Sequence, residues 1–389
     1  MRGLVLEGGG AKGAFHIGVL KALYEHDYTF DGVTGTSIGA VNGAMIAQGD
    51  FDVAYEMWQQ LTPSQVMDVD ETMLAQLIAR KFDRASLAYA LKMAKSVFAN
   101  KGLSMQKAIA LLDRYIDEDK LRRSPCDFGL VTVDTTEKWK PVEIFKEDIP
   151  VGLLKSYIAA SAYFPAFRRD PIDGKSFIDG GIYDNLPINL LIRRGGYDHI
   201  VAIRTMSRMP HGKVIDKTVR VDYINPSESL GKTLDFSNAR CNFNLKLGYF
   251  DGRRYVNGYA GKRFYVNLQG EDAGMRYFFK LPEGCYRNLK NLFGVEGDRS
   301  TVIEKIFEVI RRETGAPKST SHFDLFLVEI EPYAAAMGVE KFKIYSPSDF
   351  IEAIVSRYAQ TGKIQLDKRF FREGIRDQAV YAFLDGFQN

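Results

Sequence analysis

The sequence predicts an α/β fold in which helices flank a mainly parallel sheet. Within the first fifty residues, short apolar segments at 3–6 and 32–35 alternate with segments of helical periodicity at 11–25 and 38–47. This order is typical of parallel strands that are joined by helices. A glycine-rich turn follows each of the two strands, and glycine both stops a strand and permits a tight connection. We therefore expect a layered architecture with a parallel sheet at its centre.

Hydrophobic periodicity predicts the remaining elements in chain order. Residues 51–125 lack a strand pattern and are expected to form a helical cap inserted into the α/β domain. Beyond about residue 270 the pattern is helical, so we expect an α/β domain over 1–268 and a mainly helical region over 269–389. Further strands are expected at 128–133, 142–145, 176–178, 200–204 and 263–268. Further helices are expected at 151–160, 187–194, 302–312, 323–330, 350–358 and 370–383.

Composition excludes several classes of protein. The 389 residues include 52 Lys and Arg against 49 Asp and Glu, and a net charge of +3 does not indicate a nucleic-acid partner. The three cysteines lie far apart and match neither a disulfide scaffold nor a metal site. We see neither a signal-peptide pattern nor about 18 consecutive apolar residues. We therefore expect a cytoplasmic protein without metal or cofactor that contacts a membrane only peripherally; no oligomeric state follows from the sequence.

The first chemical motif is a glycine-rich hexamer at 8–13, between the first strand and the first helix. Glycines leave backbone N–H groups bare and a helix N-terminus adds partial positive charge, so such a turn binds an anion. The hexamer also fits G-x-G-x-x-G, but dinucleotide binding needs an acidic residue that ends the second strand, and Asp31 precedes that strand. A nicotinamide-dependent oxidoreductase and a plain tight turn are the alternatives. The hexamer consists of Gly8, Gly9, Gly10, Ala11, Lys12 and Gly13.

The second motif is G-x-S-x-G at 35–39, where the second strand gives way to a helix. Gly35 and Gly39 flank Ser37 at the spacing of a nucleophile elbow, a tight turn that exposes the serine hydroxyl at the carboxyl edge of the sheet. Adjacent parallel strands would bring both motifs to one edge. We therefore expect the N–H groups of residues 9–11 and of Ile38 to surround a tetrahedral oxyanion. Taken alone, the pentamer also fits an ordinary strand-to-helix turn.

A serine nucleophile needs a base, and two residues are candidates. Asp179 ends a short apolar strand before Gly180 and Gly181, so its carboxylate is expected at the carboxyl edge, where burial beside Ser37 would raise its pKa. His211 follows a strand by several residues and would give a Ser/Asp/His triad. We favour Asp179 because the neighbours of His211 have the composition of a surface loop, although an aspartate in a plain turn is the alternative. The histidines judged less suitable are His16, His26, His199 and His322.

Together the three motifs resemble those of the patatin-like phospholipase family, in the family's order. The A-S-A-Y-F-P segment at 160–165 and the pair Asn185 and Pro187 look similar as well, so the resemblance covers roughly residues 1–268. It implies a three-layer α/β/α fold and a dyad of Ser37 and Asp179 without histidine, with the glycine-rich turn as the oxyanion hole. It also implies hydrolysis of acyl esters of phospholipids or other lipids, without calcium. An ordinary α/β-hydrolase is disfavoured, because its oxyanion loop follows the third strand.

The cap insertion contains a basic segment between Met73 and Lys101, with six Lys and Arg against one Asp. Basic amphipathic helices lie on anionic lipid surfaces. We therefore expect this segment to cover the cleft and to dock on lipid through Lys92 and Lys95. A solvated outer face of an ordinary helix is the alternative. A non-catalytic lipid-binding or interaction module is a further alternative for the whole chain.

Overall fold

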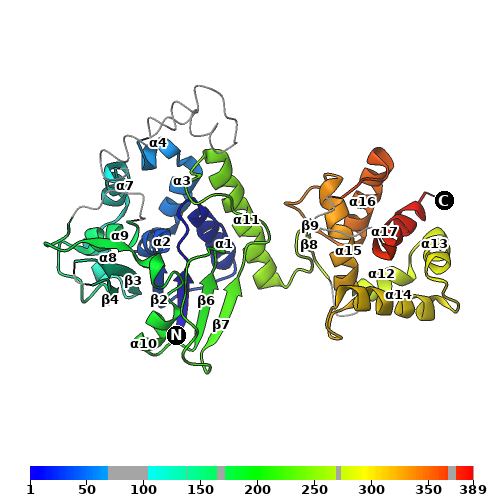
Figure 1. Cartoon of the computed structure of the whole chain (residues 1–389), viewed down its shortest axis with the longest axis horizontal. Coiled ribbons are helices and arrows are strands. Elements are labelled where there is room, and N and C mark those ends of the chain that lie inside the picture. Colours follow the sequence, from blue (N-terminus) through cyan, green and yellow to red (C-terminus); the bar gives the residue numbers. More distant parts are fainter. Residues whose placement is uncertain (69–103, 137, 164–170, 269–272, 367–373, 389) are drawn as a thin grey trace. The chain divides into compact units, whose positions relative to one another are not determined.

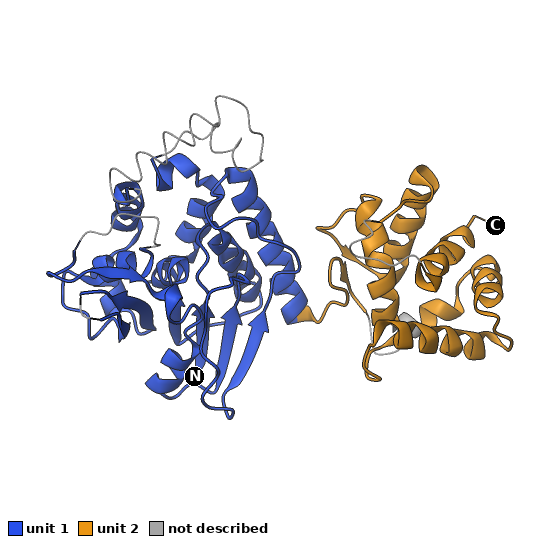
Figure 2. Ribbon diagram, viewed as in Figure 1, with its two compact units in different colours: residues 1–256 blue, residues 257–389 orange. Residues whose placement is uncertain are grey.

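The computed structural model describes residues 1–68, 104–136, 138–163, 171–268, 273–366 and 374–388. The chain divides into two compact units, residues 1–256 and residues 257–389 (Figure 2). Each unit has a hydrophobic core of its own. All three sequence motifs lie in the first unit, which is therefore the part of the chain that positions the candidate site.

A mainly parallel sheet of seven strands forms the centre of the first unit (Figure 1). The strands are β1 (Arg2–Leu6), β2 (Gly32–Thr36), β3 (Asp127–Asp134), β4 (Lys140–Phe145), β5 (Phe177–Asp179), β6 (His199–Ile203) and β7 (Arg220–Ile224). Their order is β4-β3-β2-β1-β6-β7, and β5 pairs with the last residues of β3. β4 and β5 run antiparallel to β3, whereas the other neighbouring pairs are parallel.

Helices cover both faces of this sheet. They are α1 (Ala14–Tyr24), α2 (Ile38–Ala47), α3 (Phe51–Gln60), α4 (Pro63–Val66), α7 (Gln106–Tyr115), α8 (Glu118–Arg123), α9 (Leu154–Ser161), α10 (Ile188–Arg194) and α11 (Asn238–Asn257). On one face, Leu191 of α10 shares a core with Val5 of the sheet. On the other face, Gly43 of α2 lies close against Val33 and Phe128. The resulting three-layer α/β/α arrangement confirms the predicted fold class.

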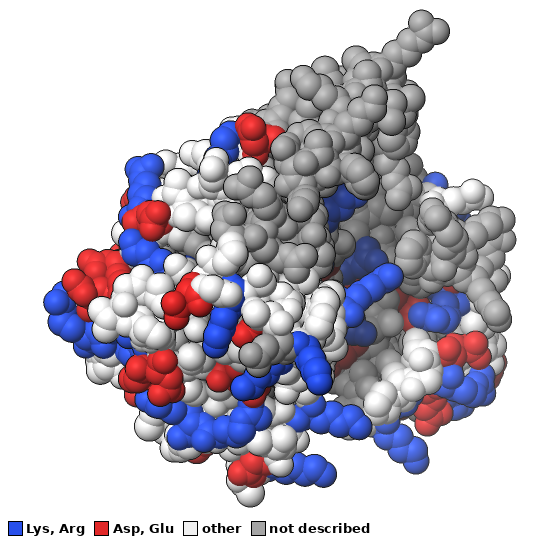
Figure 3. All heavy atoms as spheres, turned by 60° about the vertical axis from the view of Figure 1, so that its left-hand side comes forward, with Lys and Arg blue, Asp and Glu red and all other residues white. Residues whose placement is uncertain are grey.

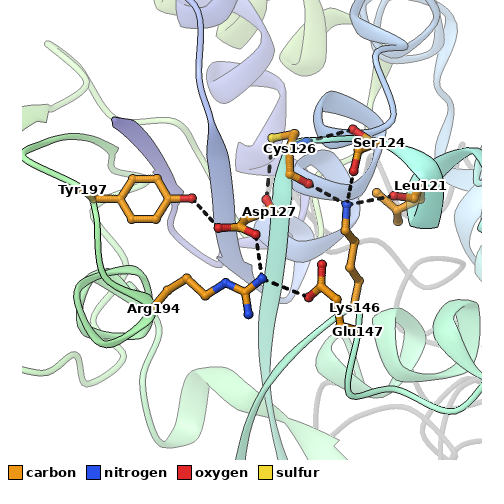
Figure 4. A network of polar contacts seen from close by, with 8 residues as sticks. All are labelled: Leu121, Ser124, Cys126, Asp127, Lys146, Glu147, Arg194 and Tyr197. Atoms are coloured by element: carbon orange, nitrogen blue, oxygen red, sulfur yellow. Dashed lines mark hydrogen bonds and ion pairs between the residues drawn. The ribbon is translucent and has the colours of Figure 1, made fainter.

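A polar network fixes the amino-terminal edge of the sheet (Figure 4). Asp127, the first residue of β3, accepts hydrogen bonds from Arg194 at 2.8 Å and from the Tyr197 hydroxyl at 2.7 Å. Beside it, the buried ammonium of Lys146 donates to three backbone carbonyls at 2.6–3.1 Å. Those carbonyls belong to Leu121, Ser124 and Cys126. Because this edge is occupied by structural contacts, the opposite, carboxyl edge is the one left for chemistry.

The second unit is mainly helical and contains a small parallel sheet. Its helices are α12 (Ala273–Phe279), α13 (Glu283–Phe293), α14 (Arg299–Thr314), α15 (His322–Ala336), α16 (Pro347–Thr361) and α17 (Ile375–Asp385), and its strands are β8 (Tyr265–Val266) and β9 (Ile344–Tyr345). Phe264 and Val266 lie in the core of this unit. Residues 257–268 therefore pack with the helices, and the units divide earlier along the chain than the boundary expected at 268.

Several elements differ from those expected from the sequence. Neither β7 nor the long helix α11 is predicted from the sequence. The strand expected at 263–268 is shorter and pairs with β9 of the second unit, not with the central sheet. The helix expected at 370–383 is α17, for which residues 367–373 are outside the described part of the chain. The basic segment between Met73 and Lys101, with Lys92 and Lys95, also lies outside the described residues.

Candidate active site

Ser37 occupies a sharp turn between β2 and α2. Its φ of 56° and ψ of −126° form a combination that side-chain-bearing residues rarely adopt. The turn also packs backbone against backbone: a Cβ on Gly39 would lie 2.1 Å from the carbonyl oxygen of Leu6, and one on Gly35 would lie 2.2 Å from that of Gly39. The close approach of these backbone segments therefore requires glycine at both positions. The resulting turn holds Ser37 at the carboxyl end of β2.

Asp179 reaches the same place from a strand that runs the opposite way. Thr36, the last residue of β2, pairs with Val131 of β3. Asp179, the last residue of β5, pairs with the next residue of β3, Thr132. β2 and β5 therefore meet end to end along β3, and Ser37 and Asp179 stand where they meet. The direction expected for this strand, toward the carboxyl edge, is wrong, because β5 runs antiparallel to β3 and enters from beyond that edge.

Burial dominates the electrostatics of Asp179, whose exposed fraction is 5%. Its Oδ1 accepts a hydrogen bond of 2.7 Å from the Gly181 N–H, and its carboxylate interacts with the Ser37 side chain. Burial raises the pKa of Asp179 to about 6, although the interactions with Gly181 and Ser37 act in the opposite direction. A carboxylate with this pKa is a stronger base than an exposed aspartate, yet it is largely ionised at neutral pH.

Ser161, at the end of α9, holds the elbow in position. Its buried Oγ accepts a hydrogen bond of 2.9 Å from the Ser37 N–H and donates one of 2.7 Å to the carbonyl of Val131. The Ser37 N–H is therefore engaged and is not free for a ligand. In the sequence, Ser161 is only part of the 160–165 segment and has no predicted role. Its contacts join segments that lie far apart in the chain, so no local pattern could have revealed them.

The glycine-rich turn keeps some of its N–H groups bonded within the protein. The Gly8 N–H donates to the carbonyl of Asn185 at 3.0 Å, and the Ala11 N–H donates to that of Thr233 at 2.8 Å. In the described part of the chain, the N–H groups of Gly9 and Gly10 have no such partner. Gly10 has a φ of +58°, and a Cβ there would lie 2.3 Å from the Thr233 carbonyl oxygen. The backbone N–H groups of the turn that are free to bind a ligand are therefore fewer than the predicted set of residues 8–13.

The other residues of the hexamer shape the turn. A Cβ on Gly13 would lie 2.5 Å from Cγ1 of Ile38, so glycine at this position allows α2 to lie close to the turn. Lys12 is half-buried and its N–H donates to the Gly9 carbonyl at 3.3 Å. Burial lowers the pKa of Lys12, and the nearby charge of Glu7 partly offsets this. These two residues therefore fix the turn from within the fold.

Asn185 joins the glycine-rich turn to the loop that follows Asp179. Its carbonyl accepts the Gly8 N–H, and its Nδ2 donates to the Gly8 carbonyl at 3.3 Å. A Cβ on Gly181 would lie 2.6 Å from its Oδ1, so Gly181 is also needed for this approach. A Cβ on the neighbouring Gly180 would lie 2.1 Å from the Val131 carbonyl oxygen. Sequence reasoning named Asn185 only through the family resemblance; the structure shows that it links two of the motifs.

A mostly apolar cavity lies beside Ser37. It contains about 910 Å³ of empty space, part of it open to solvent. Both Gly10 and Ser37 line it, so the glycine-rich turn and the elbow border one space. Apolar side chains of α2, α3 and α7 form much of the remaining wall, among them Val41, Met45, Met57, Trp58, Ala108 and Leu112. The arrangement can hold a flexible apolar group next to a serine.

The residues that supported other predictions lie elsewhere. His211 is exposed in the connection after β6, and its Nδ1 lies 3.4 Å from the Gly212 carbonyl oxygen. Among the described residues it forms no hydrogen bond with Ser37. Asp31 precedes β2, and its carboxylate accepts the Arg2 N–H at 2.7 Å, at the amino-terminal edge. His16 is buried behind the turn, and burial lowers its pKa to about 3. None of the three is placed to act with Ser37.

Two further observations concern only the described residues. No helix there has the length and the apolar character needed to cross a bilayer. No three histidine, cysteine, aspartate or glutamate side chains there are grouped as metal ligands would be.

Comparisons with known proteins point to one family. Residues 4–192 match the family model described as Patatin-like phospholipase. Patatin-like phospholipase domain-containing protein 7 of Rattus norvegicus is 28% identical over 209 residues, which are 53% of this chain and 14% of that protein. Neuropathy target esterase sws of Drosophila melanogaster is 29% identical over 208 residues, 52% of this chain and 12% of that protein. This chain therefore matches only a small part of these much longer relatives.

One solved structure aligned with the chain is that of VipD from Legionella pneumophila. The alignment covers 100% of this chain and 91% of that one, at 13% sequence identity and a TM-score of 0.41. A likeness of this size supports no argument about function.

Proposed function

Because this chain belongs to the patatin-like phospholipase family through the domain at residues 4–192, we propose that it is a serine lipid acyl hydrolase. Its substrates would be acyl esters of phospholipids or related lipids. One observation carries this proposal: β2 and β5 meet end to end along β3, which brings Ser37 and buried Asp179 together beside an apolar cavity. No step of the proposed reaction requires a metal or a cofactor.

In the proposed mechanism, Ser37 Oγ attacks the ester carbonyl carbon while the Asp179 carboxylate takes the hydroxyl proton. The carbonyl oxygen becomes an oxyanion, which the free N–H groups of Gly9 and Gly10, with that of Ile38, would stabilise. The tetrahedral intermediate then collapses, and protonated Asp179 returns the proton to the departing alkoxide. This leaves an acyl group on Ser37.

Water completes the proposed cycle. Asp179, again ionised, takes a proton from a water molecule that attacks the acyl carbonyl, and the second tetrahedral intermediate releases a fatty acid and restores the Ser37 hydroxyl. One residue thus serves as base and as acid in both halves of the reaction. The raised pKa of Asp179 suits both tasks, because a group close to neutrality gives and takes protons readily.

The cavity is the proposed seat of the acyl chain. Its wall of aliphatic, methionine and aromatic side chains would exclude water from a hydrocarbon chain whose carbonyl lies at Ser37. Because Gly10 and Ser37 line the same space, a chain bound there would place its ester next to the proposed oxyanion donors. This favours esters with a sizeable apolar acyl group.

The proposal is tested by labelling the 389-residue chain with a fluorophosphonate probe and locating the modified peptide by mass spectrometry. We expect covalent modification at Ser37 of the folded chain, and none after heat unfolding or in Ser37→Ala. Hydrolysis of a chromogenic fatty-acyl ester should fall by about a thousandfold in Ser37→Ala and in Asp179→Asn.

His211→Ala is the matched control for the choice of base. It should keep the activity of the wild type, since His211 is exposed and, among the described residues, does not bond to Ser37. Activity that survives in Asp179→Asn but is lost in His211→Ala would assign the reaction to a Ser/Asp/His triad. Lipid binding without any turnover in the wild type would instead indicate a non-catalytic module.

A further inference from the structure

The tip of the hairpin that joins β3 to β4 holds out a large aromatic side chain. Trp139 is 59% exposed. Both Trp139 and Lys138 have positive φ angles, 57° and 51°, which residues other than glycine seldom adopt. The other tryptophan of the chain, Trp58, is fully buried. An exposed tryptophan on a strained turn does not contribute to the hydrophobic core of this chain. Backbone strain of this kind is often found where a ligand is bound.

This tip lies at the edge of the sheet that carries Ser37. β3 continues for three residues beyond the end of β2, and at about 3.3 Å per residue this takes the chain roughly 10 Å past the elbow before the tip begins. The base of the tip is anchored: the Thr135 N–H donates to the Ser176 carbonyl at 2.7 Å, and the Ser176 N–H donates to Thr136 Oγ1 at 2.7 Å. The aromatic side chain therefore projects from a fixed base.

Lysines outnumber acidic residues at the tip, where the sequence places Glu137 directly before Lys138. Lys138 and Lys140 flank Trp139 in the chain, and Lys175 precedes the Ser176 to which the tip is bonded; all three lysines are exposed. None of the three forms an ion pair within the described part of the chain. Elsewhere on this side of the molecule, Lys and Arg are interspersed with Asp and Glu (Figure 3). The local combination of one tryptophan with unpaired lysines is therefore a property of the tip itself.

We propose that this tip is a membrane anchor: Trp139 enters the headgroup region of an anionic phospholipid surface, and Lys138, Lys140 and Lys175 contact its phosphates. Tryptophan prefers the boundary between headgroups and acyl chains, and lysines are attracted to anionic lipid. A protein partner would need a complementary face of about 800 Å², whereas only five residues, 135–139, join β3 to β4. The proposal deepens the proposed function, since it would hold the Ser37 edge against its substrate.

Tryptophan fluorescence of the 389-residue chain tests the anchor directly. On addition of vesicles made of phosphatidylcholine and phosphatidylglycerol, we expect the emission to shift to shorter wavelength and to be quenched by brominated acyl chains. Trp58→Phe should keep this shift, because the reporter is Trp139. Trp139→Ser should lose it and bind the vesicles about tenfold more weakly in sedimentation. Lys138→Glu with Lys140→Glu should weaken binding to anionic vesicles but not alter the fold.

Val151→Ser is the matched control, because Val151 is 84% exposed but follows β4 at the opposite edge of the sheet. It should bind vesicles as the wild type does. Unchanged vesicle binding by Trp139→Ser, or a shift that disappears in Trp58→Phe, would overturn the anchor. Hydrolysis of a soluble butyryl ester separates the two proposals. Trp139→Ser should retain this hydrolysis. A wild type that binds vesicles through Trp139 but hydrolyses no ester would support the membrane anchor and contradict the proposed enzymatic function.

Discussion

At Asp179, burial acts on chemistry and on stability in opposite directions. The usual pKa of an aspartate is 3.8, and burial raises that of Asp179 to about 6. The folded state therefore holds this proton more tightly than the unfolded chain, so stability is lost as the pH rises between the two values. A difference of about two pH units corresponds to roughly 3 kcal/mol. A fold that keeps a carboxylate in such surroundings gains a base near neutrality, which is typical of functional groups.

The activity should accordingly have an acid limb set by Asp179. Because the carboxylate must be ionised to accept the Ser37 proton, kcat/KM for a soluble ester should be constant above about pH 7 and fall tenfold per unit below about pH 6. The measurement is a pH profile of kcat/KM with a butyryl ester. A limb near pH 4 would mean that the base is an ordinary exposed carboxylate and would contradict the assignment.

Asp179→Asn tests how the raised pKa of Asp179 affects the stability of the fold. The asparagine carbonyl can still accept the Gly181 N–H but carries no charge, so the variant should unfold at a higher temperature than the wild type at pH 8. This gain should shrink as the pH falls toward 4, where the wild-type carboxyl is protonated in the folded state. Thermal unfolding at the two pH values checks it, and an inactive variant that is no more stable at pH 8 would count against the burial argument.

Among the elements, those next to the motifs could be predicted from the sequence, because local chemistry determines them. The glycine-rich hexamer and the elbow each mark a strand that ends and a helix that begins, and β1, α1, β2 and α2 lie where the sequence analysis expects them. The direction of β5 could not be predicted. A strand of three residues has no pattern of its own, and it pairs with the residues of β3 that extend past β2, where the ladder positions are open to a strand of either direction.

α11 was not predicted from the sequence, for a different physical reason. Its contact with α1 is made by backbone rather than by a stripe of large apolar side chains: a Cβ on Gly248 would lie 2.3 Å from the Phe15 carbonyl oxygen, and one on Gly18 would lie 2.0 Å from that of Leu245. Helices that approach this closely need little side-chain hydrophobicity, so the periodic signal is weak. β7 is similarly hidden, because the edge strand carries Arg220 and Asp222.

α7 forms one wall of the cavity, and a change on that wall should alter the preferred acyl chain. Ala108 lines the cavity, so Ala108→Phe would fill part of the space proposed for the acyl chain. We expect about a tenfold loss in kcat/KM for a palmitoyl ester and little change for a butyryl ester. The measurement is the ratio of kcat/KM for the two chromogenic esters.

Ala110→Phe is the control on the same helix. Ala110 is exposed and does not line the cavity, so the same substitution there should leave the palmitoyl-to-butyryl ratio unchanged. Equal effects of both variants would show that the helix, not the cavity, was disturbed. Equal losses for both esters in Ala108→Phe would mean that the acyl chain lies elsewhere.

For the whole molecule, the division into units decides which part of the chain contains a complete site. Ser37, Asp179 and the residues that line the cavity lie within residues 1–256. The composition changes near residue 270, but Phe264 and Val266 are almost fully buried in the core of the second unit. The sequence could show the change in pattern but not which core these residues join, because a short apolar segment fits either one. A boundary chosen from composition alone would therefore assign part of one core to the other unit.

Two fragments that differ by ten residues test this division. A fragment of residues 1–258 ends just after α11, so it should fold cooperatively and hydrolyse a butyryl ester with kcat/KM within about threefold of the full chain. A fragment of residues 1–268 keeps Phe264 and Val266 without the helices that bury them, so it should aggregate. Circular dichroism, light scattering and the ester assay check both. If the shorter fragment is folded but inactive, the second unit contributes to catalysis, because removal of the second unit would then be the cause of the lost activity.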